Sequence, residues 1–560
     1  MKNLSWLILT VFALFLFASC GGSENDSVQT DEDDSVAVSL RVARDADSGC
    51  TGMELDCLTK ELAAISFQIR NGNGETVFQK SFARNDLKNL KEIKGIKNAD
   101  NATLIVSVFL GSDTTTPKWQ GKASGLKFEK GKTTSVTILL YPIATQPKEI
   151  SMPEGLTIAR FGHSATVLGD GRILVAGGFP SCGANGKCVA TESVEIIDIE
   201  SGMIESSTGE NKTLVNLNEK RAMHTTIALN DGSVLFIGGV QGFSAISQEE
   251  AFEDFPILPY SQLNAVTTIE RYMPAYPKHN MKTNGSGTPI ANYTENIPAD
   301  IPFMAFQSIH AERISDTQTD VFLVGGVDEA GVPSNKAYKF TITETEDGEV
   351  LVSEAAELAE SSTPMILPAL AYSNGSIFAV GGRNNSSESA ASLISESESK
   401  DLGEKSNNIF FTNSLYANNS LYTFGGLPNE SGNLVNSDQD GVIRKWDIDG
   451  SAKTPDSKNL LRTWGKNIAF AGTLFDSERN RLIVVGGTDA EDLYQVINAA
   501  DLELFGSSPT HKMSDKRIMP QLSVVPAGII GERPILVITG GTSALDSTGS
   551  AANSIKINIL

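Results

Sequence analysis

Short runs of β-branched and aromatic residues alternate with turn-forming residues along most of the chain. Seven of these runs end in two consecutive glycines, as in ILVAGG, VLFIGG and VFLVGG. The doublets are Gly177-Gly178, Gly238-Gly239, Gly325-Gly326, Gly381-Gly382, Gly425-Gly426, Gly486-Gly487 and Gly540-Gly541. Their spacings of 61, 87, 56, 44, 61 and 54 residues mark an internal repeat of β-rich units. The pattern therefore predicts an all-β repeat protein.

Each run that ends in a doublet is preceded by another apolar strand and a short turn, and a third strand follows most doublets. Paired glycines permit a tight turn with positive φ where neighbouring sheets crowd together. With four strands per unit, the seven units predict a seven-bladed β-propeller over residues 143–560. The last unit stops one strand short, so we expect the spare run Lys148–Pro153 to supply its outer strand.

Before the repeats, residues 36–142 contain six more β-rich runs separated by turns. The pattern predicts a small antiparallel β-sandwich that serves as a spacer. The expected strands are Val36–Val42, Ile65–Arg70, Thr76–Phe82, Leu104–Leu110, Trp119–Phe128 and Thr134–Leu140.

The segment Arg160-Phe-Gly-His163 recurs as Arg221-Ala-Met-His224 in the second unit. With its Gly-Gly doublets, the chain resembles the kelch-repeat family, including the propeller of galactose-oxidase-like proteins. The resemblance implies a kelch-type propeller, which most often serves as a platform for binding protein or carbohydrate. Galactose-oxidase-like copper chemistry needs two His, two Tyr and a cross-linked Cys, and we identify no such set. We interpret His163 and His224 as architectural, because they recur at the same repeat position.

The N-terminus has the pattern of an export signal, with Lys2 before an apolar run from Leu4 to Phe17. The sequence Phe17-Ala18-Ser19-Cys20 resembles the lipobox of bacterial lipoproteins, which implies lipidation at Cys20. An ordinary secretory signal with an incidental Cys is the alternative. We expect a signal peptide at residues 1–20 and an acidic flexible linker at 21–35. The resemblance also implies an anchor in the outer membrane, because Gly21 stands where some lipoproteins kept in the inner membrane have Asp. The protein then faces the periplasm or the surface, and the acidic linker favours the surface.

Charge and cysteine content narrow the compartment and the partners. The 560 residues hold 45 Lys and Arg against 68 Asp and Glu, a net charge of -23, so we expect no nucleic-acid partner. Contact with the membrane is expected through the lipid anchor alone. The other cysteines form two local pairs, Cys50 with Cys57 and Cys182 with Cys188, which predict two disulfides in an oxidising compartment. A cysteine-bound metal is the rival interpretation.

Loop lengths predict which face of the propeller binds ligand. Turns between the first and second strands are brief, whereas long loops follow the doublets or join the blades: Phe179–Ala190, Val240–Leu263, Pro274–Pro302 and Leu427–Gly441. Long loops on a rigid scaffold often carry recognition, and aromatic side chains provide contact area. The candidate binding residues are Phe243, Phe252, Phe255, Tyr260, Tyr276 and Tyr293. The alternative is that these aromatic residues pack their own loops against the rim.

One segment matches the start of a calcium loop. Asn436, Asp438 and Asp440 have the spacing of oxygen ligands, and Asp447 stands at the twelfth position. Asp447 also corresponds to Asp198 of the first unit, so a solvated turn is the alternative to a calcium site. No other cofactor is predicted.

These observations predict an envelope-anchored binding protein that uses the loop-rich face of its propeller to bind protein or carbohydrate. Two alternatives remain open. The first is a carbohydrate-acting enzyme of oxidase or epimerase type on the same fold. The second is a structural subunit of an envelope complex.

Overall fold

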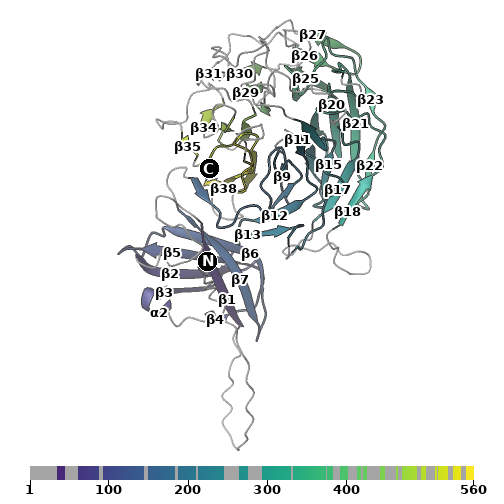
Figure 1. Ribbon diagram of the computed structural model, residues 1–560. Helices are drawn as coiled ribbons and strands as arrows, with labels where there is room; N and C mark the ends of the chain where they lie inside the picture. Colours follow the sequence, from purple (N-terminus) through teal and green to yellow (C-terminus); the bar gives the residue numbers. More distant parts are fainter. Residues whose placement is uncertain are drawn as a thin grey trace, which may run out of the picture.

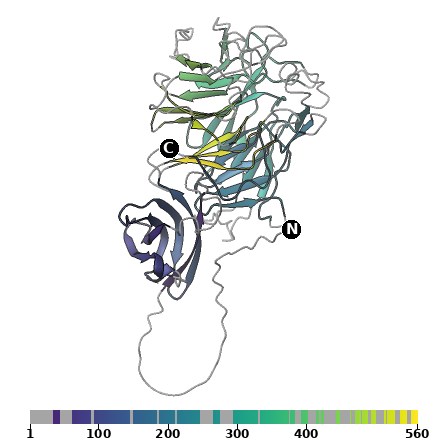
Figure 2. The ribbon, with the colours of Figure 1, turned by 60° about the vertical axis from the view of Figure 1, so that its left-hand side comes forward.

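The structure is a computed structural model in which nearly all regular structure is β (Figures 1 and 2). It describes residues 34–43, 61–87, 93–143, 149–182, 187–209, 212–244, 264–274, 293–328, 332–373, 375–382, 391–401, 413–417, 420–424, 442–447, 462–463, 470–477, 479–487, 493–499, 511–513, 515–526, 534–543 and 550–559. No helix among these residues is long and apolar enough to cross a membrane. The described strands form an N-terminal barrel and a propeller, as Figure 1 shows.

The N-terminal domain is a single mixed sheet of seven strands, in the order β3-β2-β5-β6-β7-β1-β4. Its elements are β1 (Asp34–Val42), β2 (Leu62–Arg70), β3 (Thr76–Ala83), the short helix α2 (Arg84–Leu87), β4 (Ile93–Ile96), β5 (Ala99–Leu110), β6 (Trp119–Phe128) and β7 (Thr133–Pro142). The end strands β3 and β4 come into contact, so the sheet curls into a nearly closed barrel.

The predicted antiparallel sandwich is therefore wrong, although the six expected strands are present. The first strand, β1, lies parallel to the last strand, β7, with Val36 opposite Thr134 and Val42 opposite Leu140. This long-range pair joins the strands into one sheet, and the short strand β4 then pairs with the free edge of β1. Alternate residues of β5, such as Leu104, Val106 and Val108, fill the barrel interior rather than a space between two sheets.

The propeller contains one blade for each Gly-Gly repeat, and in every blade the doublet directly follows the second strand. From the innermost to the outermost strand, blade 1 is β9 (Ser164–Val167), β10 (Ile173–Ala176), β12 (Val194–Asp198) and β13 (Met203–Ser206); blade 2 is β14 (Thr225–Ala228), β15 (Val234–Ile237), β17 (Ile269–Met273) and β18 (Tyr293–Ile297); blade 3 is β19 (Ser308–Arg313), β20 (Gln318–Val324), β21 (Ala337–Glu344) and β22 (Val350–Val352), with β23 (Ala356–Glu357) also paired to β21.

The other blades follow the same order. Blade 4 is β24 (Ala369–Ser373), β25 (Ser376–Val380), β26 (Ala391–Ile394) and β27 (Ser399–Asp401); blade 5 is β28 (Asn413–Ala417), β29 (Ser420–Phe424), β30 (Val442–Asp447) and β31 (Arg462–Thr463); blade 6 is β32 (Gly472–Asp476), β33 (Arg481–Val485), β34 (Leu493–Asn498) and β35 (His511–Lys512); blade 7 is β36 (Gln521–Val525), β37 (Ile535–Thr539), β38 (Lys556–Ile559) and β8 (Glu149–Ser151).

The ring is closed by both ends of the repeat region. The innermost strands contact one another in sequence, and β36 of the last blade contacts β9 of the first. The outer strand of blade 7 is β8, which pairs with β38 through Ile150 and Ile557. This pairing confirms that the run before the first repeat completes the last blade. Strands from opposite ends of the repeat region thus hold the propeller together.

The doublets occur where two blades approach most closely. Every described doublet glycine has a positive φ, between 58° and 121°, and Gly425 and Gly426 lie outside the described residues. A Cβ on Gly177 would lie 2.3 Å from the carbonyl oxygen of Arg221 in the next blade, and the Gly178 N–H donates to that same oxygen at 2.9 Å. The glycines therefore permit both the backbone conformation and the contact between blades.

The barrel packs directly against blades 1 and 7. Four consecutive residues of β7, Ile138 to Tyr141, are buried, which indicates that both faces of this strand are covered. Leu139 donates its N–H to the Glu200 carbonyl at 2.7 Å, and the Tyr141 hydroxyl donates to the Ile199 carbonyl. One hydrophobic cluster runs from the barrel interior into both blades. The barrel is thus fixed to the propeller.

Strand directions define two faces of the propeller. Second strands end and third strands begin on the Gly-Gly face, whereas the first-second and third-fourth turns lie on the opposite face, here called the turn face. The sequence predicted that residues 274–302 connect two blades on the Gly-Gly face. This prediction is wrong for the part of the segment before Tyr293. Because Met273 pairs with Tyr293, the chain between them joins the third and fourth strands of blade 2 on the turn face.

Candidate functional site

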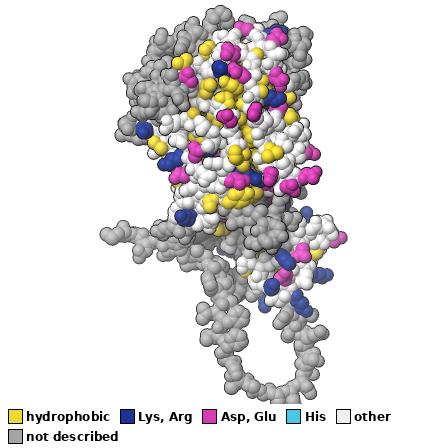
Figure 3. Space-filling model, turned by 90° about the vertical axis from the view of Figure 1, so that its right-hand side faces the viewer, with side chains coloured by type: hydrophobic (Ala, Val, Ile, Leu, Met, Phe, Trp, Pro, Cys, Tyr) yellow, Lys and Arg dark blue, Asp and Glu magenta, His cyan; other side chains and the backbone are white. Residues whose placement is uncertain are grey.

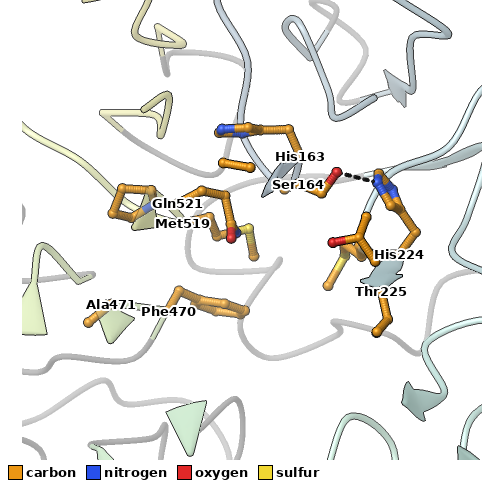
Figure 4. A pocket seen from close by; sticks show the side chains of 13 residues that line it. His163, Ser164, His224, Thr225, Phe470, Ala471, Met519 and Gln521 are labelled. Carbon is orange, nitrogen blue, oxygen red and sulfur yellow. Dashed lines mark hydrogen bonds between the residues drawn. The ribbon is translucent and has the colours of Figure 1, made fainter. Parts of the chain in front are cut away.

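A pocket of about 460 Å³ opens at the propeller axis, between the innermost strands of blades 1, 2, 6 and 7. Its side chains surround an open space, with Phe470 on one side and His224 and Thr225 on another (Figure 4). The lining residues are Gly162, His163, Ser164, Ala165, Met223, His224, Thr225, Thr226, Phe470, Ala471, Met519, Pro520 and Gln521. They lie at the starts of the innermost strands, so the pocket is at the Gly-Gly face.

One repeated backbone bend surrounds the propeller axis, and its members in blades 1, 2, 6 and 7 line the pocket. In six of the seven blades, the residue two positions before the innermost strand has a φ between 52° and 61°. The equivalent residue of blade 5 lies outside the described residues. These residues are Gly162, Met223, Phe306, Leu367, Phe470 and Met519. Successive members are hydrogen-bonded around the axis: the Met223 N–H donates to the Gly162 carbonyl at 2.7 Å, and the Met519 N–H to the Phe470 carbonyl at 2.9 Å.

Large side chains at positive φ are uncommon and cost roughly 1–2 kcal/mol each. The bend is held in place from behind, because the residue before it pairs with the residue that follows the Gly-Gly doublet. Ala222, for example, pairs with Val240, and Ala305 pairs with Val327. The doublet turns therefore hold the bend, which places this residue at the axis in each of the six blades.

The two pocket histidines connect neighbouring blades. His163 Nε2 lies 2.9 Å from Thr539 Oγ1 in blade 7, and His224 Nε2 lies 2.8 Å from Ser164 Oγ in blade 1. The Nδ1 atoms of both rings are buried without a hydrogen-bond partner among the described residues. Burial, reinforced by Arg221, lowers the pKa of His224 to about 3, and burial with Arg160 lowers that of His163 well below its usual value. Both imidazoles are therefore neutral at physiological pH.

Buried arginines support the pocket from behind. Arg160 and Arg221 are fully buried, and each donates to the carbonyl of the first doublet glycine of its own blade, Gly177 at 2.9 Å and Gly238 at 3.1 Å. Arg221 also pairs with the fully buried Glu270 at 3.0 Å. The charged groups of these residues bond to partners inside the blades and do not line the pocket. Among the described residues that line the pocket, none is Asp, Glu, Lys or Arg.

The arrangement suits reversible binding of an uncharged group. Ser164, Thr225 and Thr226 bring hydroxyls to the wall, and the Gln521 side-chain amide has no hydrogen-bond partner among the described residues. Phe470 offers an aromatic ring. A pocket within the range of about 300–1,000 Å³, with a few polar groups beside apolar ones, has the character of a small-molecule site.

The sequence-predicted residues lie elsewhere or outside the described residues. The Cys182–Cys188 disulfide is present and confirms that pairing, whereas Cys20, Cys50 and Cys57 lie outside the described residues. The disulfide loop joins blade 1 to blade 2 on the Gly-Gly face, because β11 (Lys187–Val189) pairs with β16 (Gly242–Ser244).

The candidate aromatic residues do not form one cluster in the described structure. Phe243 pairs by its backbone with Cys188 on the Gly-Gly face, whereas Tyr293 begins β18 on the turn face. The side chain of Tyr293 is half-buried, and burial raises its pKa. Four of the candidates lie outside the described residues: Phe252, Phe255, Tyr260 and Tyr276.

The predicted calcium ligands Asn436, Asp438 and Asp440 also lie outside the described residues. Asp447 ends the third strand of blade 5, as Asp198 ends that of blade 1. The Asp198 carboxylate accepts the Glu200 N–H at 2.9 Å, so this position caps a turn in blade 1. Within the described ranges, no group of three His, Cys, Asp or Glu side chains is placed to hold a metal ion.

The outer rim differs from the pocket in carrying many charges. Figure 3 shows acidic and basic side chains mixed with apolar ones on one side of the molecule. Val332 and Leu351 of blade 3 are more than half exposed, at 55% and 53%.

The pocket was not predicted from the sequence. Of its lining residues, only the two histidines stood out there, as residues at the same position of the repeat. The only sequence signal for these bend residues is their place in the repeat. Each directly precedes His163, His224 or the residue at the same position of another unit. That position holds Gly, Met, Phe or Leu, which share no obvious chemistry. No known protein-family model matches the chain, and no curated protein sequence is similar to it.

Proposed function

We propose that the protein is an envelope-anchored binding protein whose propeller is of the kelch type, and that it holds an uncharged ligand in the axial pocket of the Gly-Gly face. The ligand class that the lining favours is carbohydrate, presented by a free glycan or by a glycosylated protein. The export signal, the lipobox-like Cys20 and the Gly-Gly repeats support the anchoring and the family.

The observation that carries the proposal is the chemistry of the pocket wall. A sugar ring has hydroxyls that both donate and accept hydrogen bonds, and the Gln521 side-chain amide can do the same. The Ser164 and Thr225 hydroxyls donate to the Ala176 and Ile309 carbonyls and keep oxygen lone pairs that can accept from a ligand. The polarised C–H bonds of a sugar ring are attracted to the negative face of an aromatic ring, and Phe470 offers one. A charged ligand would lose its hydration without gaining a counter-ion from the described lining.

A glycan array tests this directly. The full-length protein, purified in detergent, is applied to arrays of neutral and acidic glycans. We expect retention on a subset of the neutral glycans and none that depends on uronic or sialic acid. Retention only on acidic glycans, or on no glycan, would reject carbohydrate binding at this pocket.

The anchoring is tested separately. Cys20→Ser should abolish labelling of the protein by a radioactive fatty acid and release it from the membrane fraction. Protease treatment of intact cells, beside a periplasmic marker, then decides between surface and periplasm. Digestion with the marker intact would support the surface, and full protection until lysis would reject it.

A further inference from the structure

The ring of repeated bends around the propeller axis lacks a side chain at one described position. Five of the residues with the repeated bend carry large apolar side chains, namely Met223, Phe306, Leu367, Phe470 and Met519, whereas blade 1 has Gly162. The equivalent residue of blade 5 lies outside the described residues. Met223, Phe470 and Met519 line the pocket together with Gly162. The pocket thus reaches the backbone of blade 1, where another blade would place a side chain.

The glycine is not needed for the backbone conformation. Its φ of 61° lies close to the 52° to 58° of the five large residues, so this fold accepts a side chain at the bend. It is also not needed for packing. A Cβ on Gly162 would lie 3.5 Å from Met223 Cγ and 3.5 Å from the nearest carbon of the Phe179 ring, which is ordinary van der Waals contact. This is unlike Gly177, whose Cβ would meet backbone at 2.3 Å.

From these observations we propose that Gly162 is a specificity-determining gap, which admits one uncharged sugar ring between Phe470 and the start of β9. This inference rests on the proposed carbohydrate-binding function and adds the position that selects the ligand. The gap lies directly before His163 and Ser164, where polar groups begin, whereas Met223 and Met519 flank it on either side. A ring entering there meets apolar side chains at the rim and hydroxyls deeper in the pocket.

Filling the gap is the direct test. In Gly162→Met, the new side chain has the residue type that blade 2 carries at a similar φ. Its Cβ packs against Met223 and the Phe179 ring, and the rest of the side chain should take up volume of the pocket. Titration calorimetry is performed on the full-length protein with cellobiose, maltose and N,N′-diacetylchitobiose. We expect the disaccharide that binds the wild type to lose at least about tenfold in affinity, because a ligand ring and a methionine cannot share one space.

Two further variants separate strain and misfolding from loss of the gap. Gly348→Ala places a Cβ at a φ of 83° in a turn of blade 3 with no atom within 4 Å, and should bind as the wild type does. Gly162→Ala adds only the Cβ that fits, and should reduce affinity by less than methionine does. Met519→Gly, in contrast, opens a second gap and should admit larger glycans.

The outcomes distinguish the inference from the function on which it rests. If the wild type binds a disaccharide and Gly162→Met binds it equally well, the gap is refuted and the binding function stands. If the wild type binds none of the disaccharides, the glycan array decides whether carbohydrate binding stands, and Gly162→Cys decides whether the gap is open. Alkylation of that thiol by iodoacetamide, but not of a cysteine replacing the buried Ala305, would support an open gap, and no reaction would overturn it.

Discussion

Substituting one doublet glycine tests whether the doublets exist because neighbouring blades touch there. In Gly177→Ala, the new Cβ would lie 2.3 Å from the Arg221 carbonyl oxygen and 2.8 Å from His224 Cε1. Since the nearest atom is backbone, the seam between blades 1 and 2 must open. The Gly178 N–H would then lose part of its 2.9 Å hydrogen bond to the same oxygen.

The expected loss of stability is the sum of three effects. A side chain at positive φ costs roughly 1–2 kcal/mol, and the weakened hydrogen bond costs about 1 kcal/mol more. Displacing the packed backbone of the next blade adds to these, so we expect a total of at least about 3 kcal/mol. Gly348→Ala has a φ of 83° and no neighbour within 4 Å, so it should cost the conformational part alone.

Urea unfolding followed by intrinsic fluorescence measures both variants against the wild type. We expect a clearly larger loss of stability for Gly177→Ala than for Gly348→Ala. Equal losses would refute the reasoning, because they would show that the conformation alone, and not the contact between blades, requires glycine at the doublet.

Three other perturbations probe separate parts of the structure. Deleting Ser554–Leu560 removes β38, the partner of both β37 and β8, so cooperative unfolding of the propeller should be lost; a truncated protein that melts as before would contradict the closure. Arg221→Met leaves the buried Glu270 without its cation and should cost about 3–5 kcal/mol in urea unfolding. Adding Glu270→Gln removes the unpaired charge, keeps an acceptor for the Asn218 N–H and the Thr294 hydroxyl, and should recover part of the loss. Because the pKa of His224 is lowered to about 3, this imidazole is protonated in the unfolded chain but neutral in the folded protein between about pH 6.5 and 3. The contribution of His224 to stability is therefore complete above about pH 6.5 and falls by about 2 kcal/mol by pH 5, beside a loss of the same sign from His163. His224→Gln should remove its own part of the acid loss, and an unchanged pH slope would show that His224 is not responsible.

The repeats made the propeller predictable, because each unit has the same local pattern and each doublet follows a strand. The N-terminal domain was harder to predict. Its strands were correctly located, but the sheet is decided by the parallel pairing of β1 with β7, which are about a hundred residues apart and carry no joint signal. The outermost strand β18 was also missed, since none of its residues is fully buried and Tyr293-Thr-Glu-Asn-Ile shows no apolar run.

The pocket depends on backbone geometry rather than on residue type. Phe470 and Met519 look like ordinary apolar residues before a strand, and only their positive φ places them at the axis. Gly162 looks like one more turn glycine among fifty. Its distinct role emerges when its φ is compared with those of the five equivalent residues, a comparison that the sequence alone does not offer.

The most direct test of the central claim, that ligand is held at the propeller axis, is a tryptophan reporter in the pocket wall. Phe470→Trp keeps an aromatic ring at this position and places an indole against the bound ligand. We predict that a neutral glycan retained by the wild type shifts the emission of this indole, and that the shift saturates at the affinity measured by calorimetry. A glycan that binds with the same affinity but leaves the emission unchanged would contradict the account, because the ligand would then occupy another site.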